Sequence, residues 1–377
     1  MLTGLMDHWV PSHDAISRFW KTPFRTLKPH LEKLCDEVAI NNFTFYTKWY
    51  SNGVRSSLPF LRNCPDAMNV ITANDWGREL IEFFHSRGMT VGAMLQNYMF
   101  DAGTFPPEAV LGPWKGIQAC TGYATDDDII NPAWDGYPGV LSQMLEEQLR
   151  LFPGLDAVFL EFEGLGAAPA GNPLWQLAHA GGGAQAKIPA ETRAFWETTG
   201  YPVTAPPDPW LWTPAVQDIL RRTLRSHLTA ADRALTRAGF AGVRGVVYHA
   251  MGYEVPYVLD CLPDRNWWPL PWHYWGWDYS LADPEPMIRR QLDYCKGAFR
   301  DLVRSGYKLC YIGNATLPSK RFDCITEMVR LSEEIGAAGY LGMGDPIPTY
   351  GLRWHGATEE SVAAARRLYR DELFPKR

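Results

Sequence analysis

Apolar segments of strand length alternate with amphipathic helical segments along the whole chain. Residues 156–163, DAVFLEFE, show the strand pattern clearly, because Val158, Leu160 and Phe162 fall on one face of an extended chain. Residues 214–238 show the helical pattern, with apolar side chains three or four positions apart. The predicted strands are 2–8, 38–47, 89–97, 156–163, 243–250, 272–279, 307–314 and 338–343. Predicted helices between them include 75–87, 140–152, 214–238, 256–262, 285–304 and 358–372.

Eight strand–helix alternations that end on a helix predict a (β/α)8 TIM barrel formed by a single domain over residues 1–377. A doubly wound sheet is the competing fold, but no GxGxxG segment follows the first predicted strand. Two connections, 98–139 and 164–211, are much longer than usual. Both follow strands, so we expect them at the carboxyl end of the barrel, where barrel enzymes place their active sites.

Composition excludes several classes of function. The chain of 377 residues is 46% hydrophobic, which allows a large core, and it carries a net charge of −6. Without a long basic run, we expect neither nucleic acid nor membrane as a partner. No apolar stretch reaches 18 residues, and the first residues lack a signal-peptide pattern. Self-association into a homo-oligomer is compatible with the sequence.

The seven cysteines are scattered, odd in number and never in CxxC spacing. This pattern favours buried, reduced thiols in a cytoplasmic protein over a disulfide framework or a zinc site. No HExxH or HxH motif occurs either. We therefore predict that the protein uses no cofactor and no metal.

Glu161 and Glu163 share one face of the strand 156–163, next to a glycine-rich loop. Two carboxylates on one face repel each other, so folding gains little from them. Each raises the pKa of the other, which keeps one protonated near neutral pH. The pair therefore predicts acid–base or nucleophilic chemistry; the competing explanation is an ion pair with a barrel cation such as Lys48.

Carboxylates, histidines and tryptophans follow the other predicted strands, and parallel strands would bring them to one rim. Aromatic faces stack on sugar rings, amides and carboxylates bind hydroxyls, and two carboxyl groups can break a glycosidic bond. We therefore predict a carbohydrate substrate, with Glu161 as nucleophile or transition-state stabiliser and Glu163, Asp278 or Glu254 as general acid. The predicted substrate-binding residues are Asp7, His8, Trp9, Lys48, Trp49, Tyr50, Asn97, His249, Trp277 and Asn314.

Several segments resemble retaining α-L-fucosidases, in the same order along residues 1–336. These are GLMDHWVPS, FTFYTKWYSNG, DWGRELIEFFHSRGMTVGAML, DAVFLEFEG, YWGWDYS and YKLCYIGNA. The resemblance implies a sugar-cleaving barrel in which His8 and Trp9 bind the sugar and Glu161 takes the nucleophile position. Here a glutamate replaces that family's aspartate, and Trp49 and Tyr50 replace two histidines.

The fourth predicted strand also resembles chitinase-type barrels, whose acids alternate along this strand. Asp156, Glu161 and Glu163 match three of those positions, and Phe159 departs from the pattern. This resemblance implies that Glu163 is the acid and that an acetamido group of the substrate attacks. Two other hypotheses are a sugar-binding barrel without catalysis, and a metal-dependent isomerase or lyase. The latter would use Asp7, His8, His249 and Asp278.

Overall fold

The fold is given by a computed structural model that describes part of the chain. The described residues are 1–7, 24–49, 52–53, 56–61, 76–97, 99–100, 102–113, 128–130, 134–161, 214–249, 255–273, 285–314, 322–344 and 359–376. Of the two long connections predicted from the sequence, most of 98–139 lies inside these ranges, whereas 164–211 lies outside them.

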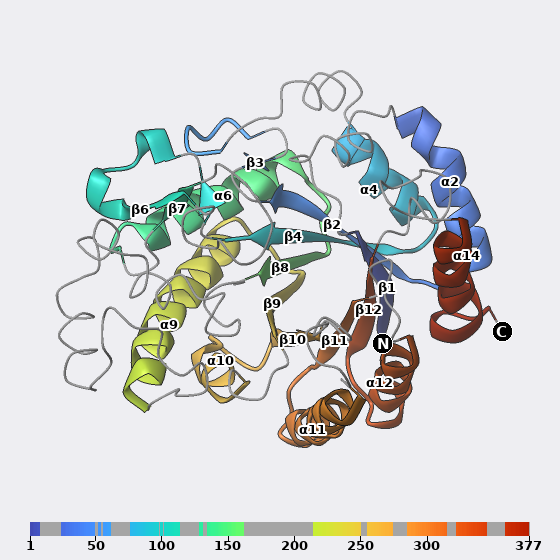
Figure 1. Ribbon diagram of the computed structural model, residues 1–377. Coiled ribbons are helices and arrows are strands. Elements are labelled where there is room, and N and C mark those ends of the chain that lie inside the picture. The colour runs from blue at the N-terminus through green and yellow to red at the C-terminus, as the bar shows by residue number, and fades with distance from the viewer. Residues whose placement is uncertain are drawn as a thin grey trace.

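Eight parallel strands form a closed barrel (Figure 1), which confirms the predicted (β/α)8 fold. In barrel order they are β1 (Leu2–Asp7), β2 (Asn42–Trp49), β4 (Thr90–Gln96), β8 (Ala157–Glu161), β9 (Val243–His249), β10 (Trp267–His273), β11 (Cys310–Asn314) and β12 (Gly339–Gly344). The barrel closes because β1 pairs in parallel with both β12 and β2. All eight carboxyl ends therefore meet at one end of the barrel.

A helix follows each barrel strand and covers its outer face (Figure 1). The helices are α2 (Phe24–Glu37), α4 (Trp76–Ser86), α6 (Tyr137–Leu151), α9 (Pro214–Arg237), α10 (Val255–Cys261), α11 (Glu285–Arg304), α12 (Phe322–Glu334) and α14 (Glu359–Arg367). A π-helical segment, Leu368–Leu373, continues α14. The outer face of β2 shows the packing, since the ring of Phe43 stacks on that of Phe84 in α4 at 4.5 Å.

Glycines on two strands make room for an aromatic ring inside the barrel. Phe159 lies in the middle of β8, between β4 and β9. A Cβ atom at Gly245 would lie 2.8 Å from Cδ1 of Phe159 and 2.3 Å from Cδ1 of Leu270. A Cβ atom at Gly92 would lie 3.4 Å from Cε2 of Phe159 and 2.5 Å from Oγ1 of Thr44. Phe159 therefore fills the barrel interior directly below the next inward position of its strand, Glu161.

The sixth barrel strand lies earlier in the sequence than predicted. It is Trp267–His273, WWPLPWH, rather than 272–279. Prolines within the segment argue against a central strand, because proline lacks the N–H donor. In the structure β10 pairs with β9 from Trp267 to Trp272, but with β11 only at Trp272 and His273. Both prolines precede the ladder with β11, so pairing on that side does not need their N–H groups.

The connection after β4 forms a small antiparallel sheet (Figure 1). Its strands are β5 (Met99–Phe100), β6 (Val110–Pro113) and β7 (Asp128–Ile130), with β7 in the centre. Two short 3-10 helices, Ala102–Thr104 and Pro107–Ala109, lie between β5 and β6. A two-residue strand, β3 (Asn52–Gly53), pairs with the end of β2. The described part of the predicted long loop therefore includes a small sheet, which Lys48 contacts from the end of β2.

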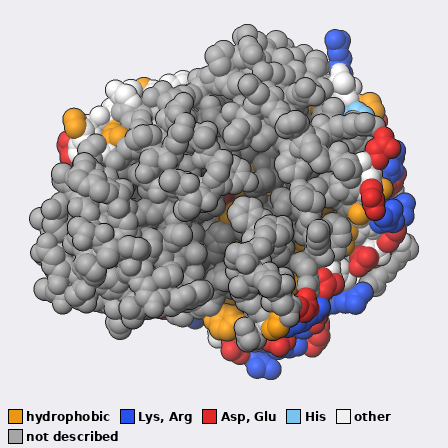
Figure 2. All heavy atoms as spheres, viewed as in Figure 1, with side chains coloured by type: hydrophobic (Ala, Val, Ile, Leu, Met, Phe, Trp, Pro, Cys, Tyr) orange, Lys and Arg blue, Asp and Glu red, His pale blue; other side chains and the backbone are white. Residues whose placement is uncertain are grey.

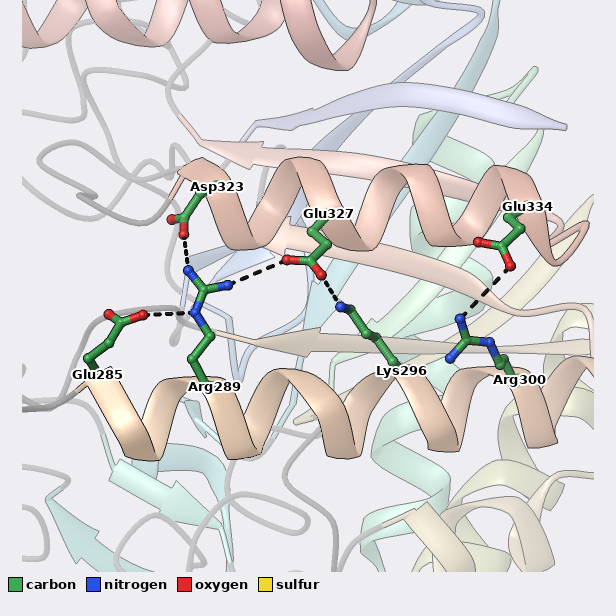
Figure 3. Close-up of polar contacts among 7 residues, drawn as sticks. All are labelled: Glu285, Arg289, Lys296, Arg300, Asp323, Glu327 and Glu334. Carbon is green, nitrogen blue, oxygen red and sulfur yellow. Dashed lines mark hydrogen bonds and ion pairs between the residues drawn. The ribbon is translucent and has the colours of Figure 1, made fainter.

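Charges of both signs are mixed on the outer helices. Figure 2 shows acidic and basic side chains side by side along the edge occupied by α2, α14, α12 and α11 in Figure 1. Arg289 of α11 contacts Glu285 of the same helix and both Asp323 and Glu327 of α12, and Lys296 of α11 also contacts Glu327 (Figure 3). Such exposed pairs contribute about 0–1 kcal/mol each to stability. They connect the two helices, and they mix positive and negative charges on this surface.

The five cysteines among the described residues are free thiols: Cys35, Cys261, Cys295, Cys310 and Cys324. Burial raises the pKa of Cys295 to about 12 and that of Cys35 to about 11. Such thiols stay protonated and pack as small apolar groups. Among the residues that the structure describes, no helix is long and apolar enough to cross a membrane.

Candidate active site

Glu161 is the last residue of β8 and has only 1% of its surface exposed. In the strand register it lies between Gln96 of β4 and Val247 of β9. It is two residues beyond Phe159, so both side chains occupy the inner face of the strand. The structure thus places this residue, which the sequence singled out, as a buried carboxylate at the carboxyl end of the barrel.

Tyr46 on β2 binds this carboxylate directly. Its hydroxyl group donates a hydrogen bond to Oε2 of Glu161 over 2.8 Å, and the tyrosine is fully buried. The sequence analysis did not single out Tyr46, because it treated only the residues after 47 as the end of the strand. The signal was available: Asn42, Thr44 and Tyr46 alternate with phenylalanines, which puts all three on the inner face.

Asn97 directly follows β4 and contacts the backbone of Glu161. Its Nδ2 atom donates to the carbonyl oxygen of Glu161 over 2.9 Å, and its own backbone N–H donates to the same oxygen over 3.1 Å. Its Oδ1 atom lies 3.5 Å from the hydroxyl group of Tyr137. Asn97 is fully buried. The structure therefore brings this predicted residue to Glu161, where it contacts the main chain.

Lys48 lies beyond a β-bulge in β2. Tyr46 pairs with Met94 and Lys48 pairs with Leu95, so one residue of β2 is inserted between two consecutive partners. The Nζ atom of Lys48 lies 4.3 Å from the centre of the Phe100 ring in β5. A cation over an aromatic face is a favourable contact, worth about 2 kcal/mol or more when it is desolvated. Lys48 thus links the barrel to the small sheet.

The remaining predicted site residues fall into two groups. For one group the structure gives a strand end and no side-chain position: Asp7 of β1, Trp49 of β2, His249 of β9 and Asn314 of β11. Each of the four is the last residue of its strand, and the four strands end at the same end of the barrel. The other group lies outside the described residues: His8, Trp9, Tyr50, Glu163, Glu254, Trp277 and Asp278.

Asp156 lies at the opposite end of β8 from Glu161. Its Oδ2 atom accepts a hydrogen bond from the backbone N–H of Val91 over 2.8 Å and lies 2.8 Å from Nε2 of His85. These contacts tie β8 to β4 and to the end of α4. In the chitinase-type pattern Asp156 would belong to the active site, but here its carboxylate serves the amino end of the barrel.

No cluster of three or more potential metal ligands occurs within the described part of the chain. The four residues of the metal hypothesis, Asp7, His8, His249 and Asp278, have no described side chains. The described part of the site is a buried carboxylate with a tyrosine donor, at the barrel end where (β/α)8 enzymes place their active sites.

Comparison with known proteins adds a likeness at the level of structure. The sequence matches no protein-family model and no curated protein. A structure of wild-type ZgEngAGH5_4 aligns with 97% of this chain and 95% of its own, at 12% identity and a TM-score of 0.50. The likeness is one of fold.

A second similar structure is that of the pneumococcal virulence factor StrH, from a study of N-glycan recognition and hydrolysis. It aligns with 99% of this chain and 83% of its own, at 9% identity and a TM-score of 0.51. The structural neighbours are glycoside hydrolases with TIM barrels. The shared feature is therefore a barrel that those proteins use for sugar chemistry.

Proposed function

We propose that this protein hydrolyses a glycosidic bond at the carboxyl end of its barrel, with Glu161 as the nucleophile or as the stabiliser of the transition state. The observation that carries the proposal is the buried carboxylate of Glu161, held by the hydroxyl group of Tyr46 at 2.8 Å. Burying a charged carboxylate costs several kcal/mol, so a protein gains little stability from such a group. Its place at this barrel end is typical of a catalytic residue.

The direction of the Tyr46 hydrogen bond favours one role for Glu161. A hydroxyl group that donates to a carboxylate stabilises the ionised form. An ionised carboxylate can attack the anomeric carbon or stabilise positive charge on the sugar ring, whereas a general acid must begin protonated. The general acid is then a second residue, and Glu163, Asp278 and Glu254 are the candidates.

The structural neighbours support the general reaction, because they are glycoside hydrolases built on the same barrel. The sequence resemblance to α-L-fucosidases supports a narrower hypothesis, removal of a terminal fucose residue. On that hypothesis His8 and Trp9 bind the sugar as in that family, and Trp49, Tyr50, His249 and Trp277 are further sugar-binding residues predicted from the sequence. No cofactor takes part in either version of the reaction.

A panel of nitrophenyl glycosides tests the proposal. It should include α-L-fucosides, β-glucosides, β-galactosides and β-N-acetylhexosaminides, with cello- and xylo-oligosaccharides as unactivated substrates. We expect turnover on one class and its loss in Glu161→Gln. A fluorinated glycoside of the same sugar should label Glu161 if that residue is the nucleophile.

Two results would contradict the proposal. Turnover that survives in Glu161→Gln would remove this residue from the chemistry. Calorimetric binding of a sugar, with no hydrolysis of any glycoside that contains it, would show a sugar-binding barrel instead. Loss of turnover with a chelator would favour the metal-dependent hypothesis.

A further inference from the structure

Asn97 makes contacts that differ from those of a sugar ligand. A residue that binds a sugar hydroxyl needs an amide atom left for the ligand, whereas both amide atoms of the buried Asn97 contact protein atoms. Its Nδ2 atom donates to Glu161 O over 2.9 Å and also lies 3.4 Å from Leu95 O. Its Oδ1 atom accepts from the hydroxyl group of Tyr137. Each polar atom of the amide group therefore has a protein partner.

We propose that Asn97 is a positioning residue that acts through the backbone of Glu161. This inference rests on the proposed function, and it replaces the sequence-based assignment of Asn97 to substrate binding. The carbonyl oxygen of Glu161 is the last one of β8, and it accepts two hydrogen bonds from Asn97. The backbone N–H of Asn97 continues the parallel ladder, and the side-chain amide adds a second donor at the same atom.

The second donor has a mechanical consequence. Two hydrogen bonds from one residue fix the plane of the peptide group that follows Glu161, and with it the direction of the Cα–Cβ bond. Tyr46 holds the other end of the same residue, at Oε2. Glu161 is thus held at its carboxylate from β2 and at its carbonyl group from β4. Because a shift of about 1 Å in a reacting group can lower a rate about 100-fold, loss of either contact should slow the chemical step.

The chain offers a matched control in Asn42. This asparagine is also fully buried, and its Nδ2 atom donates to Oγ1 of Thr90 over 3.0 Å. Its Oδ1 atom accepts from Thr44 over 2.8 Å. Asn42 therefore also bridges β2 and β4 with its amide group, but it does so at the amino end of the barrel. Loss of either amide costs similar hydrogen bonds, and only Asn97 contacts Glu161.

The experiment compares Asn97→Ala with Asn42→Ala in the full-length protein, using the glycoside that the wild type turns over. We expect Asn97→Ala to lower kcat about 100-fold with KM unchanged, the pattern for an interaction that acts on the transition state. Asn42→Ala should lose comparable stability in a thermal melt and keep the wild-type kcat. If Asn97→Ala does not fold, the double variant Asn97→Leu with Tyr137→Phe replaces it. Leucine fills the space of the asparagine, and Tyr137→Phe removes the hydroxyl group that would otherwise lose its acceptor.

The outcomes separate this inference from the proposed function. A raised KM with unchanged kcat in the Asn97 variant would show direct substrate binding and overturn the inference. A kcat no lower than that of Asn42→Ala would also overturn it. Glu161→Gln, measured alongside, reports on the proposed function alone: if it retains turnover, the proposed role of Glu161 fails whatever the Asn97 variants show.

Discussion

The two ends of β8 carry carboxylates in contrasting surroundings. At the amino end, Asp156 is 39% exposed and accepts a backbone hydrogen bond from Val91 of β4. At the carboxyl end, Glu161 is 1% exposed and accepts from a tyrosine side chain. The first carboxylate joins neighbouring strands where water can still solvate it. The carboxylate of Glu161 is largely desolvated, which suits a group whose charge takes part in a reaction.

Other polar contacts at the amino end also join elements of the fold. Asp232 of α9 accepts from Arg244 of β9 over 2.5 Å and from the indole N–H of Trp267 over 2.9 Å. Arg366 of α14 pairs with Glu37 at the end of α2. Each contact connects a helix to a strand or to another helix. Changes at this end should therefore alter stability, and changes at the other end should alter turnover.

The largest difference should come from matched amide substitutions at the two ends. Glu161→Gln should lower turnover about 1,000-fold or more, because the amide cannot act as a nucleophile or a charge stabiliser. Its free energy of unfolding should stay equal or rise, since a buried charge is removed while the shape is kept. Asp156→Asn should keep its turnover and unfold about 1 kcal/mol more easily. Steady-state kinetics and urea unfolding of both variants test this contrast.

The next effect should come from the tyrosine that contacts Glu161. Tyr46→Phe removes a hydrogen bond to a charged group, which is worth about 1.5–3 kcal/mol. If that bond acts in the transition state, kcat should fall about 10- to 100-fold. Tyr340→Phe is the control, because its hydroxyl group is also buried but donates to Leu373 O outside the barrel. Equal kcat values for the two variants would show that Tyr46 has no special role.

A smaller effect, confined to stability, should come from Asp232. Asp232→Ala leaves the indole N–H of Trp267 buried without this acceptor and removes the partner of Arg244, at a cost of about 1–3 kcal/mol. The kcat value should stay at that of the wild type. Denaturant unfolding measures the first quantity, and a loss of kcat in a fully folded sample would break the division between the two ends.

The smallest effect should depend on pH. The guanidinium group of Arg366 holds the pKa of Glu37 below its usual value. Because the pKa of Glu37 is lower in the folded protein, the pair stabilises the fold fully above the unfolded pKa of about 4.3, and this contribution is lost as the pH falls through the folded pKa. Arg366→Met should therefore unfold about 0.5–1 kcal/mol more easily near neutral pH. This difference from the wild type should shrink in acid, and a pH-independent difference would contradict the assignment.

Most of the barrel could be predicted from the sequence, because buried strands and amphipathic helices differ in the spacing of their apolar residues. The helix 285–304 matches α11 (Glu285–Arg304), and the acid at the end of β8 stood out because charge is costly inside a strand. The first part of the strand 267–273 was missed because prolines are rare in central strands. They are tolerated here because the strand pairs with only one neighbour over most of its length.

The partners of Glu161 were harder to predict than Glu161 itself. Tyr46 reaches it from a strand that lies 115 residues away in the sequence, and a tyrosine on an apolar strand resembles an ordinary core residue. Asn97 was predicted to take part in the site, but the sequence could not show whether its amide faces a ligand or the main chain. That choice depends on the register between β4 and β8, which only the folded barrel sets.

The bulge in β2 has a consequence for how relatives of this protein should be aligned. In a regular strand Tyr46 and Lys48 would lie on the same face, but here they pair with the consecutive residues Met94 and Leu95. A homologue that keeps the letters YTKW in a regular strand would present its lysine on the inner face, opposite Gln96, whereas a homologue that lacks the residue at Thr47 would keep its lysine opposite Leu95. The same four letters therefore line the barrel differently with and without the bulge, and only the strand register distinguishes the two cases.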